Sequence, residues 1–218
     1  MTIAGNTQMM YWNQRRSRLP EGYREVDYLE STGKQWIDTG VIPSYARGDD
    51  VYSQIEFKCL ALYGYQRISG VVTGNGIYFN QFFLNVTPSA IMGAQVNSSE
   101  WLIYGEADTD WHTAGYDVRT KTVNFDGTEY PYPSIEDSAK HGFPLYLFAR
   151  NSNGEVGLFF TGRIRTFTYT DIRSYIPCVR ISDSKPGMYD LCGSICPLTG
   201  TPFYINAGAG ADFLWGEL

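Results

Sequence analysis

The segment 51–59 constrains the fold of this chain more than any other feature of the sequence. Two alternating sets of residues make it up, with Val51, Ile55, Phe57 and Cys59 in one set and Tyr52, Gln54, Glu56 and Lys58 in the other. A period of two residues is that of a β-strand with one face against a core and the other toward solvent. The segment therefore predicts a strand of a β-sandwich.

Runs of β-branched and aromatic residues, separated by Gly, Pro and Asn, recur along the chain and predict more strands. We expect them at 24–30, 35–39, 68–73, 76–86, 90–94, 101–104, 111–117, 121–127, 145–150 and 162–169. Pro177 predicts an edge strand or a bulge, because proline has no N–H for a ladder. No long segment follows a helical period, and 23 glycines with 10 prolines disfavour long helices, so the predicted class is all-β.

Composition limits the classes of function. The 218 residues suit one large β domain, and a hydrophobic content of 43% is ample for its core. The net charge is −6 with no basic stripe, so we expect no nucleic-acid partner. No stretch reaches the ~18 apolar residues of a membrane span. Cys192 and Cys196 are close in sequence but far from His112 and His141, so no zinc site is expected, and the thiol or disulfide state of the pair stays open.

Phrases at both ends of the chain resemble a known signature. The opening phrases are 28–33 (Tyr-Leu-Glu-Ser-Thr-Gly) and 36–40 (Trp-Ile-Asp-Thr-Gly), and the closing ones are 175–180, 187–190 and 203–210. They are similar to those of LamG-like, concanavalin A-like domains in surface proteins of gut bacteria and in phage structural proteins, including fibres and adhesins. The resemblance covers about residues 19–213. It implies an antiparallel jelly-roll β-sandwich in which 36–39 and 203–206 are neighbours.

The resemblance also implies a range of functions, because this fold hosts lectins, hydrolases and structural modules alike. We expect a non-enzymatic carbohydrate-binding or adhesin module of a phage virion, in a tail or head fibre, that recognises host surface glycans. One alternative is a structural virion decoration or assembly protein, and another is a glycoside hydrolase.

The chain is expected to divide into an N-terminal arm or leader, residues 1–18, and a domain, residues 19–218. The arm is polar, with Arg15, Arg16 and Arg18 at its end, and is expected to bind other virion proteins. Its first residues lack the apolar segment of a secretory signal, which favours the virion surface as the location. A bacterial cell surface, reached with a signal peptide since removed, is the alternative. A homo-oligomer is a further expectation.

Aromatic rings in or beside predicted loops are the candidate sugar contacts. The C–H faces of a sugar pack on such rings, whereas its hydroxyl groups need Asn, Asp or Arg at the edges. The candidate residues are Trp101, Asp110, Trp111, Asn124, Tyr130 and Tyr132.

The acidic segment 106–110, Glu-Ala-Asp-Thr-Asp, is similar to the catalytic strand of laminarinase-like hydrolases. In a retaining hydrolase two carboxyl groups lie about 5–5.5 Å apart. Asp110 stands where those enzymes carry Glu, and the shorter side chain makes that spacing hard to reproduce. We therefore expect a solvated acidic loop and no catalytic residue. Asp108, Asp110 and Asp117 are alternatively ligands for Ca²⁺, and no other cofactor is expected.

Overall fold

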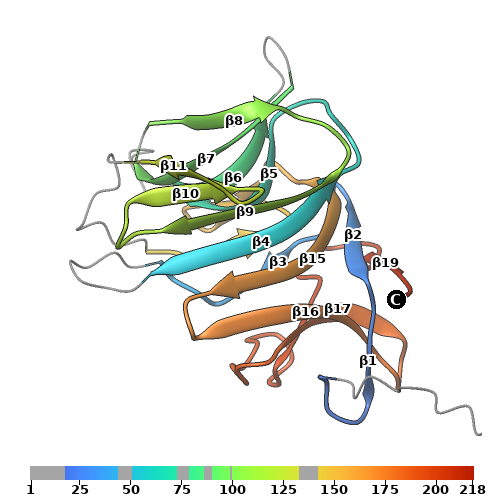
Figure 1. The fold of residues 1–218 in the computed structure, drawn as a ribbon. Helices are drawn as coiled ribbons and strands as arrows, with labels where there is room; N and C mark the ends of the chain where they lie inside the picture. Colours follow the sequence, from blue (N-terminus) through green and yellow to red (C-terminus); the bar gives the residue numbers. More distant parts are fainter. Residues whose placement is uncertain (1–17, 44–50, 73–78, 86–89, 99, 133–141) are drawn as a thin grey trace, which may run out of the picture.

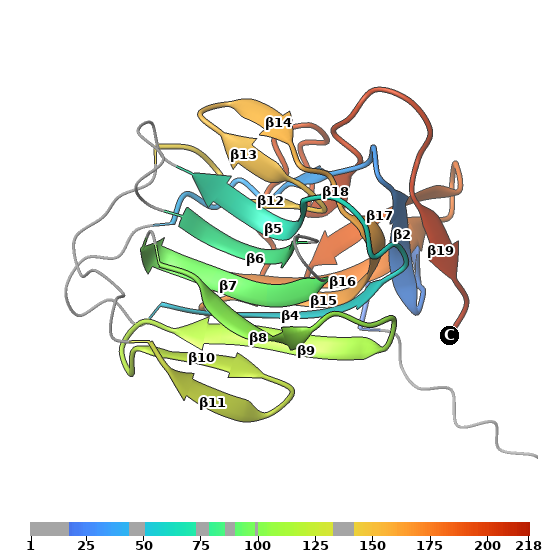
Figure 2. The same cartoon turned by 90° about the horizontal axis from the view of Figure 1, so that it is seen from above.

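The computed structural model describes residues 18–43, 51–72, 79–85, 90–98, 100–132 and 142–218, and every regular element in these ranges is a β-strand. The strands form two sheets that pack on each other (Figures 1 and 2). This arrangement confirms the predicted all-β sandwich. Among the described residues, no helix is long and apolar enough to cross a membrane.

The larger sheet has eleven strands, and all its pairs are antiparallel. Its main path runs β11 (Thr128–Pro131), β10 (Thr122–Phe125), β9 (Trp111–Asp117), β4 (Tyr52–Cys59), β15 (Thr161–Tyr169), β16 (Arg173–Arg180), β17 (Lys185–Asp190) and β18 (Phe203–Ile205). Three short strands complete it: β1 (Tyr23–Glu25) pairs with β16, and β2 (Tyr28–Thr32) pairs with β15 and β19 (Leu214–Gly216).

The smaller sheet has eight strands. Its path runs β14 (Glu155–Gly157), β13 (Arg150–Ser152), β5 (Gln66–Val72), β6 (Phe79–Asn85), β7 (Ile91–Ser98) and β8 (Leu102–Glu106), with β12 (Tyr146–Leu147) between β5 and β3 (Ile37–Asp38). All pairs are antiparallel except β13 with β5.

The core lies between the two sheets and follows the alternation in the sequence. In β4, the side chains of Ile55, Phe57 and Cys59 are at most 1% exposed, whereas Tyr52 and Gln54 face solvent. Phe82 and Leu84 of β6 face the same core from the smaller sheet. The structure therefore confirms the strand that the two-residue period of 51–59 predicted and the face of it that is buried.

The opening and closing phrases lie side by side, as predicted. The backbone N–H of Trp36 donates to Asn206 Oδ1 at 3.2 Å, and the Ala207 N–H donates to the Trp36 carbonyl at 2.9 Å. The same Asn206 oxygen accepts from Gly208 N–H at 2.9 Å. One amide side chain thus joins the start of the domain to its end.

Two predicted strands are interrupted in the structure. The run 24–30 is divided into β1 and β2 at Val26 and Asp27, because the chain changes its partner strands there: β1 pairs with β16, whereas β2 lies between β15 and β19. The N–H groups of Val26 and Asp27 donate to the carbonyls of Pro177 and Gly216. The run 145–150 is broken at Phe148, which has a positive φ of 62° and no solvent exposure. That left-handed residue lets the chain reverse, so that β12 is antiparallel to β5 and β13 is parallel to it.

Pro177 lies in an inner strand, contrary to the predicted edge or bulge. β17 pairs with β16 along one side, and on the other side the partner changes from β15, opposite Tyr175, to β1, opposite Cys178. The Pro177 carbonyl faces this change of partner and accepts from Val26 N–H. The missing N–H of proline therefore falls where no ladder bond is required.

The predicted arm falls outside the described residues except for Arg18. Arg18 forms an ion pair with Glu25 and is half exposed, whereas the neighbouring Leu19 is buried against Ile176 and Phe203. Exposed ion pairs contribute about 0–1 kcal/mol. Truncation that begins the chain at Leu19 is therefore expected to leave the melting temperature nearly unchanged. A loss of several degrees in differential scanning calorimetry would contradict a separate arm.

Candidate functional site

A groove of about 640 Å³ lies on the solvent face of the larger sheet, over β4, β9, β10 and β11. These four strands form the end of the sheet that is farthest from β18. The groove has several polar side chains in its lining, among them those of Gln54, Thr113, Asp117, Thr122, Asn124 and Glu129. It therefore offers hydroxyl, amide and carboxylate groups on one surface.

The pairing register explains why these residues meet. Gln54, Gly115, Asn124 and Glu129 are direct neighbours across the four strands, one from each. Directly opposite residues lie on the same face of a sheet. At Gly115 a Cβ atom would come within 2.9 Å of the Ser53 carbonyl oxygen. The row thus has side chains on three strands and a glycine at its centre, which keeps the floor of the groove open.

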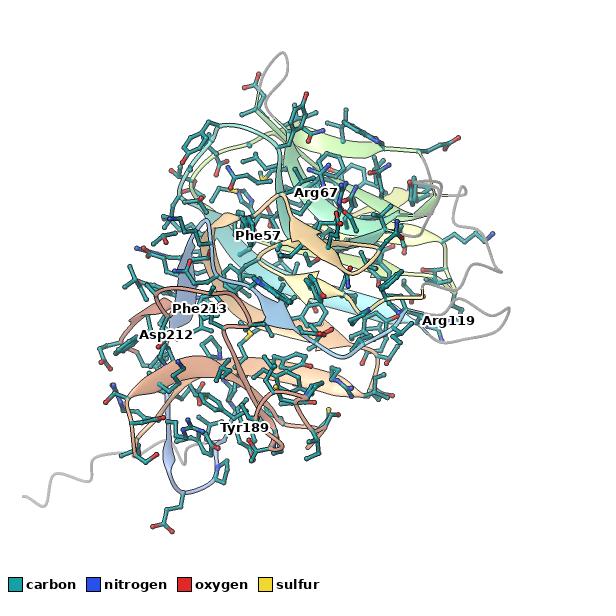
Figure 3. All side chains as sticks on the ribbon, turned by 180° about the vertical axis from the view of Figure 1, so that it is seen from behind. Phe57, Arg67, Arg119, Tyr189, Asp212 and Phe213 are labelled. Carbon is teal, nitrogen blue, oxygen red and sulfur yellow. The ribbon has the colours of Figure 1, made fainter. Side chains whose placement is uncertain are left out.

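Tyr52 forms an aromatic wall of the groove. Its side chain is 39% exposed, and its hydroxyl donates to Asp171 Oδ1 at 2.8 Å. This bond, together with burial, raises the pKa of Tyr52. A second hollow of about 230 Å³, lined by Tyr52, Asp117, Arg119 and Asp171, lies beside the groove; Arg119 is labelled in Figure 3. The ring is held in position before any ligand arrives, which lowers the ordering cost of binding.

Two carboxylates in the groove already hold the backbone in place. Asp117 Oδ1 accepts from the N–H groups of Arg119 and Thr120 in the turn after β9, at 2.8 and 3.3 Å. Asp126 Oδ1 accepts from Thr113 N–H at 2.8 Å. Asn124 Oδ1 accepts from Gly127 N–H at 3.1 Å, and its amide N–H groups donate to no other described residue. Asn124 therefore retains donors for a ligand.

His112 lies at the start of β9, between the β10–β11 turn and the connection from β8, with both ring nitrogens engaged. Nδ1 is 2.7 Å from Asp126 Oδ2, Nε2 is 2.8 Å from Asp108 Oδ1, and the ring stacks on Phe125 at 5.1 Å. Burial lowers the pKa of His112, but the two carboxylates together outweigh it and raise the pKa above 6.5. Hydrogen bonds from Asp110 N–H and from His112 lower the pKa of Asp108. The histidine thus fixes the groove backbone instead of facing the groove.

The contacts of His112 with Asp108 and Asp126 predict that the stability of the fold depends on pH. Protonated His112 donates to both carboxylates, whereas the neutral ring can donate to only one. Because the folded pKa is raised, the stabilisation is complete below pH 6.5 and is lost as pH rises through the folded pKa. We expect the melting temperature of the protein to exceed that of His112→Gln most at about pH 5 and least at about pH 9. A difference that does not change with pH would contradict this assignment.

The six residues predicted as sugar contacts do not gather at one place. Asn124 lines the groove, and Asp110 lies exposed just before β9. Trp101 is 49% exposed on the other sheet, where its ring contacts that of Phe83 at 5.1 Å. The Tyr130 ring packs near that of Tyr104, on the inner side of the β10–β11 hairpin.

Tyr132 and Trp111 are committed to other contacts. Tyr132 is 4% exposed in the core, and its hydroxyl donates to the Glu100 carbonyl, so its ring offers no face for stacking from solvent. The indole of Trp111 lies under the Arg165 guanidinium, with 3.9 Å between the ring centre and Cζ. Arg165 is itself paired with Asp27 at 2.9 Å. The core therefore encloses the Tyr132 ring, and Arg165 occupies one face of the partly buried Trp111 ring.

The acidic segment does not form a strand face. β8 ends at Glu106, and Asp108 and Asp110 follow in the connection to β9, so alternation does not align the three carboxylates as in a catalytic strand. Asp108 and Asp117 lie at opposite ends of β9, about 20 Å apart at about 3.3 Å per residue, and cannot share one Ca²⁺. Within the described ranges, no three His, Cys, Asp or Glu side chains group as metal ligands.

Sequence reasoning missed Tyr52, Gln54 and Glu129 as groove residues. Tyr52 and Gln54 were already in the outward-facing set of 51–59, which is the signal that could have selected them. The four cysteines, Cys192 and Cys196 included, are free thiols.

Comparison with known proteins gives matches to solved structures alone. No family model and no curated protein matches the chain. The CBM40 of Ruminococcus gnavus IT-sialidase is 13% identical with a TM-score of 0.45, over 70% of this chain and 91% of that one. A SAP-like pentraxin of Limulus polyphemus is 10% identical with a TM-score of 0.47, over 67% and 76%. Domains LG4-5 of the mouse laminin alpha1 chain are 13% identical with a TM-score of 0.41, over 69% and 42%. These values are too low to place the chain in any of their families.

Proposed function

We propose that this chain is a non-enzymatic glycan-binding module and that the groove over β4, β9, β10 and β11 is its site. The observation that carries the proposal is the row of Gln54, Asn124 and Glu129 around Gly115, next to the fixed ring of Tyr52. An aromatic wall suits the C–H face of a sugar, and amide and carboxylate groups suit its hydroxyls.

The groove is poorly arranged for glycoside hydrolysis, which needs two carboxyl groups in acid–base or nucleophilic roles. Asp126 is bonded through both oxygens, to Thr113 and His112, and Asp117 closes a turn. Glu129 is the remaining carboxylate that lines the groove, and no bond joins it to another described residue. One available carboxylate can bind a hydroxyl group but cannot complete a catalytic pair.

We also propose the setting expected from the sequence, the surface of a phage virion, where the glycans are those of the host and residues 1–18 contact other virion proteins. The resemblance of the opening and closing phrases supports it. Proteomic detection of the chain in purified particles, and not in the host envelope, would test the location.

A glycan array with the full chain, followed by two groove variants, tests the proposed site. Tyr52→Ala and Asn124→Ala are each expected to weaken binding about tenfold or more, equivalent to about 1.4 kcal/mol. Both should melt within about 4 °C of the parent, because the residues are partly exposed. Tyr63→Ala, at a ring that is 69% exposed and outside the groove, is the matched control and should bind normally.

Each alternative has its own result. Binding that survives both groove variants would move the site elsewhere on the domain. Absence of any glycan ligand would favour the structural virion role. Hydrolysis of a bound glycan that Glu129→Gln abolishes would make the chain an enzyme.

A further inference from the structure

The face of the smaller sheet that points away from the core carries a layer of buried polar side chains. This layer is not part of the groove. In β5, β6 and β7 one set of residues, including Ile68, Leu84 and Ala94, faces the core. The opposite side holds Arg67, Gln81, Asn85 and Gln95, each at most 5% exposed. Polar side chains in such a position need partners, because burial removes them from water.

Arg67 is at the centre of this layer. Its Nε donates to Gln81 Oε1 at 2.7 Å, and Nη1 donates to the Gln66 carbonyl at 2.9 Å and to Asn85 Oδ1 at 3.3 Å. Gln81 in turn donates to Gln95. Within the described part of the chain, Nη2 has no acceptor. Figure 3 labels Arg67, which lies in β5 of the smaller sheet, and Arg119, which lies in the turn after β9 of the larger sheet.

No carboxylate among the described residues compensates the charge of Arg67. Its hydrogen bonds end on neutral oxygens, and no described Asp or Glu forms an ion pair with it. A second arginine, Arg150, lies close by: a Cβ atom on Gly70 would meet Gln81 Cβ at 3.1 Å and Arg150 Cγ at 3.2 Å. Burial and the charge of Arg150 lower the pKa of Arg67 to about 10. A buried cation beside a like charge is destabilising unless an anion joins it.

We propose that this layer is a second binding site, separate from the groove, for a small oxyanion of the carboxylate or sulfate class. The planar guanidinium of Arg67 would bind the anion through its unused Nη2 edge, and Arg150 would add charge. At the rim, the half-exposed ring of Trp101 packs on Phe83, over which the Arg67 guanidinium also lies. Two arginine side chains can bind either the carboxylate of an acidic sugar or an inorganic sulfate ion, so the probes must distinguish these two ligands.

Thermal unfolding of the full chain, with ionic strength held constant by sodium chloride, tests the site. The probes are sodium glucuronate, sodium sulfate and, as the neutral counterpart, glucose. We expect the melting temperature to rise with ln(1 + [anion]/Kd), by about 3–6 °C at ten times Kd, for at least one of the two anions. Glucose should give no such logarithmic rise. The more effective anion identifies a carboxylate or a sulfate as the ligand group.

Three variants assign the response to Arg67. Arg67→Met should lose the logarithmic rise and keep the gradual increase that sulfate gives any protein through exclusion from its surface. It should also be at least as stable as the parent without anions, because an unpaired buried charge has been removed. Arg67→Lys should bind the anion at least about tenfold more weakly, since the planar fork is lost. Arg24→Met, at an exposed arginine paired with Glu217, is the control and should respond like the parent.

Three results would overturn the proposal. They are the absence of a logarithmic rise with either anion, a logarithmic rise retained in Arg67→Met, and an Arg67→Met chain that no longer folds. The last result would show that the neutral oxygens around Arg67 are enough to make it a structural residue. The groove variants are independent of all three, so the two sites stand or fall separately.

Discussion

Replacement of Asp190 by alanine is expected to lower the free energy of unfolding by about 3–5 kcal/mol, the usual result of removing one partner from a buried ion pair. Asp190 is fully buried. Its Oδ1 accepts from the N–H groups of Ser174 and Cys192, both at 3.0 Å, and its Oδ2 lies 3.8 Å from Arg173 Nε. Without the carboxylate, two N–H groups and a largely buried arginine lose their partner at the end of β17.

For a chain of this size, such a loss corresponds to a fall in melting temperature of about 6–20 °C. Asp190→Asn should fall between the parent and Asp190→Ala, since the amide oxygen can still accept from the two N–H groups but carries no charge. Asp183, which pairs with Arg180 at the surface, provides a matched control, and Asp183→Ala should melt like the parent. Equal effects at Asp183 and Asp190 would show that burial does not determine the contribution of these pairs.

Phe213→Ala is expected to be destabilising to a similar degree, about 3–5 kcal/mol, because it opens a cavity in the core. The Phe213 ring is 1% exposed and lies 4.9 Å from that of Phe148, the residue at which the chain reverses between β12 and β13. The residue follows Asp212 and precedes β19, so this core contact belongs to the last segment of the chain (Figure 3).

The neighbouring residue supplies the control for Phe213. Leu214 is 52% exposed, and Leu214→Ala should change stability by no more than about 0.5 kcal/mol. Urea unfolding of both variants would measure the difference from the midpoint, provided that the slope stays constant. A small effect at Phe213 would mean that the closing segment is not part of the cooperative core.

Local patterns predicted the parts of the fold that local forces determine. The alternation of 51–59 identified β4 and its buried face, since a period of two leaves one choice of inner residues once a core exists. The break at Phe148 was not predictable in this way, because a phenylalanine at positive φ is held there by packing and by bonds to Ile68 and Phe160. Pairing between distant segments decides such positions.

The candidate site shows the same division. Tyr52 and Asn124 come from strands that are distant in sequence, and they line one groove only because the register of β4, β9 and β10 aligns them. The sequence around an aromatic residue does not reveal which side chains will contact its ring in the folded protein. Trp111 and Tyr132 were predicted as sugar contacts for their rings, yet Arg165 covers one and the core encloses the other.

The positions of the chain ends have a consequence for display. Figures 1 and 2 show β1 and the C-terminal end at β19 on one side of the molecule, with the β10–β11 hairpin on the other. A support joined to the domain at either end therefore leaves the groove accessible. When several copies share one support, a first bound groove holds its neighbours near the same surface at an effective concentration on the order of millimolar. If the proposed groove binds glycans, a weak single contact would in this way become durable attachment without any change in the groove itself.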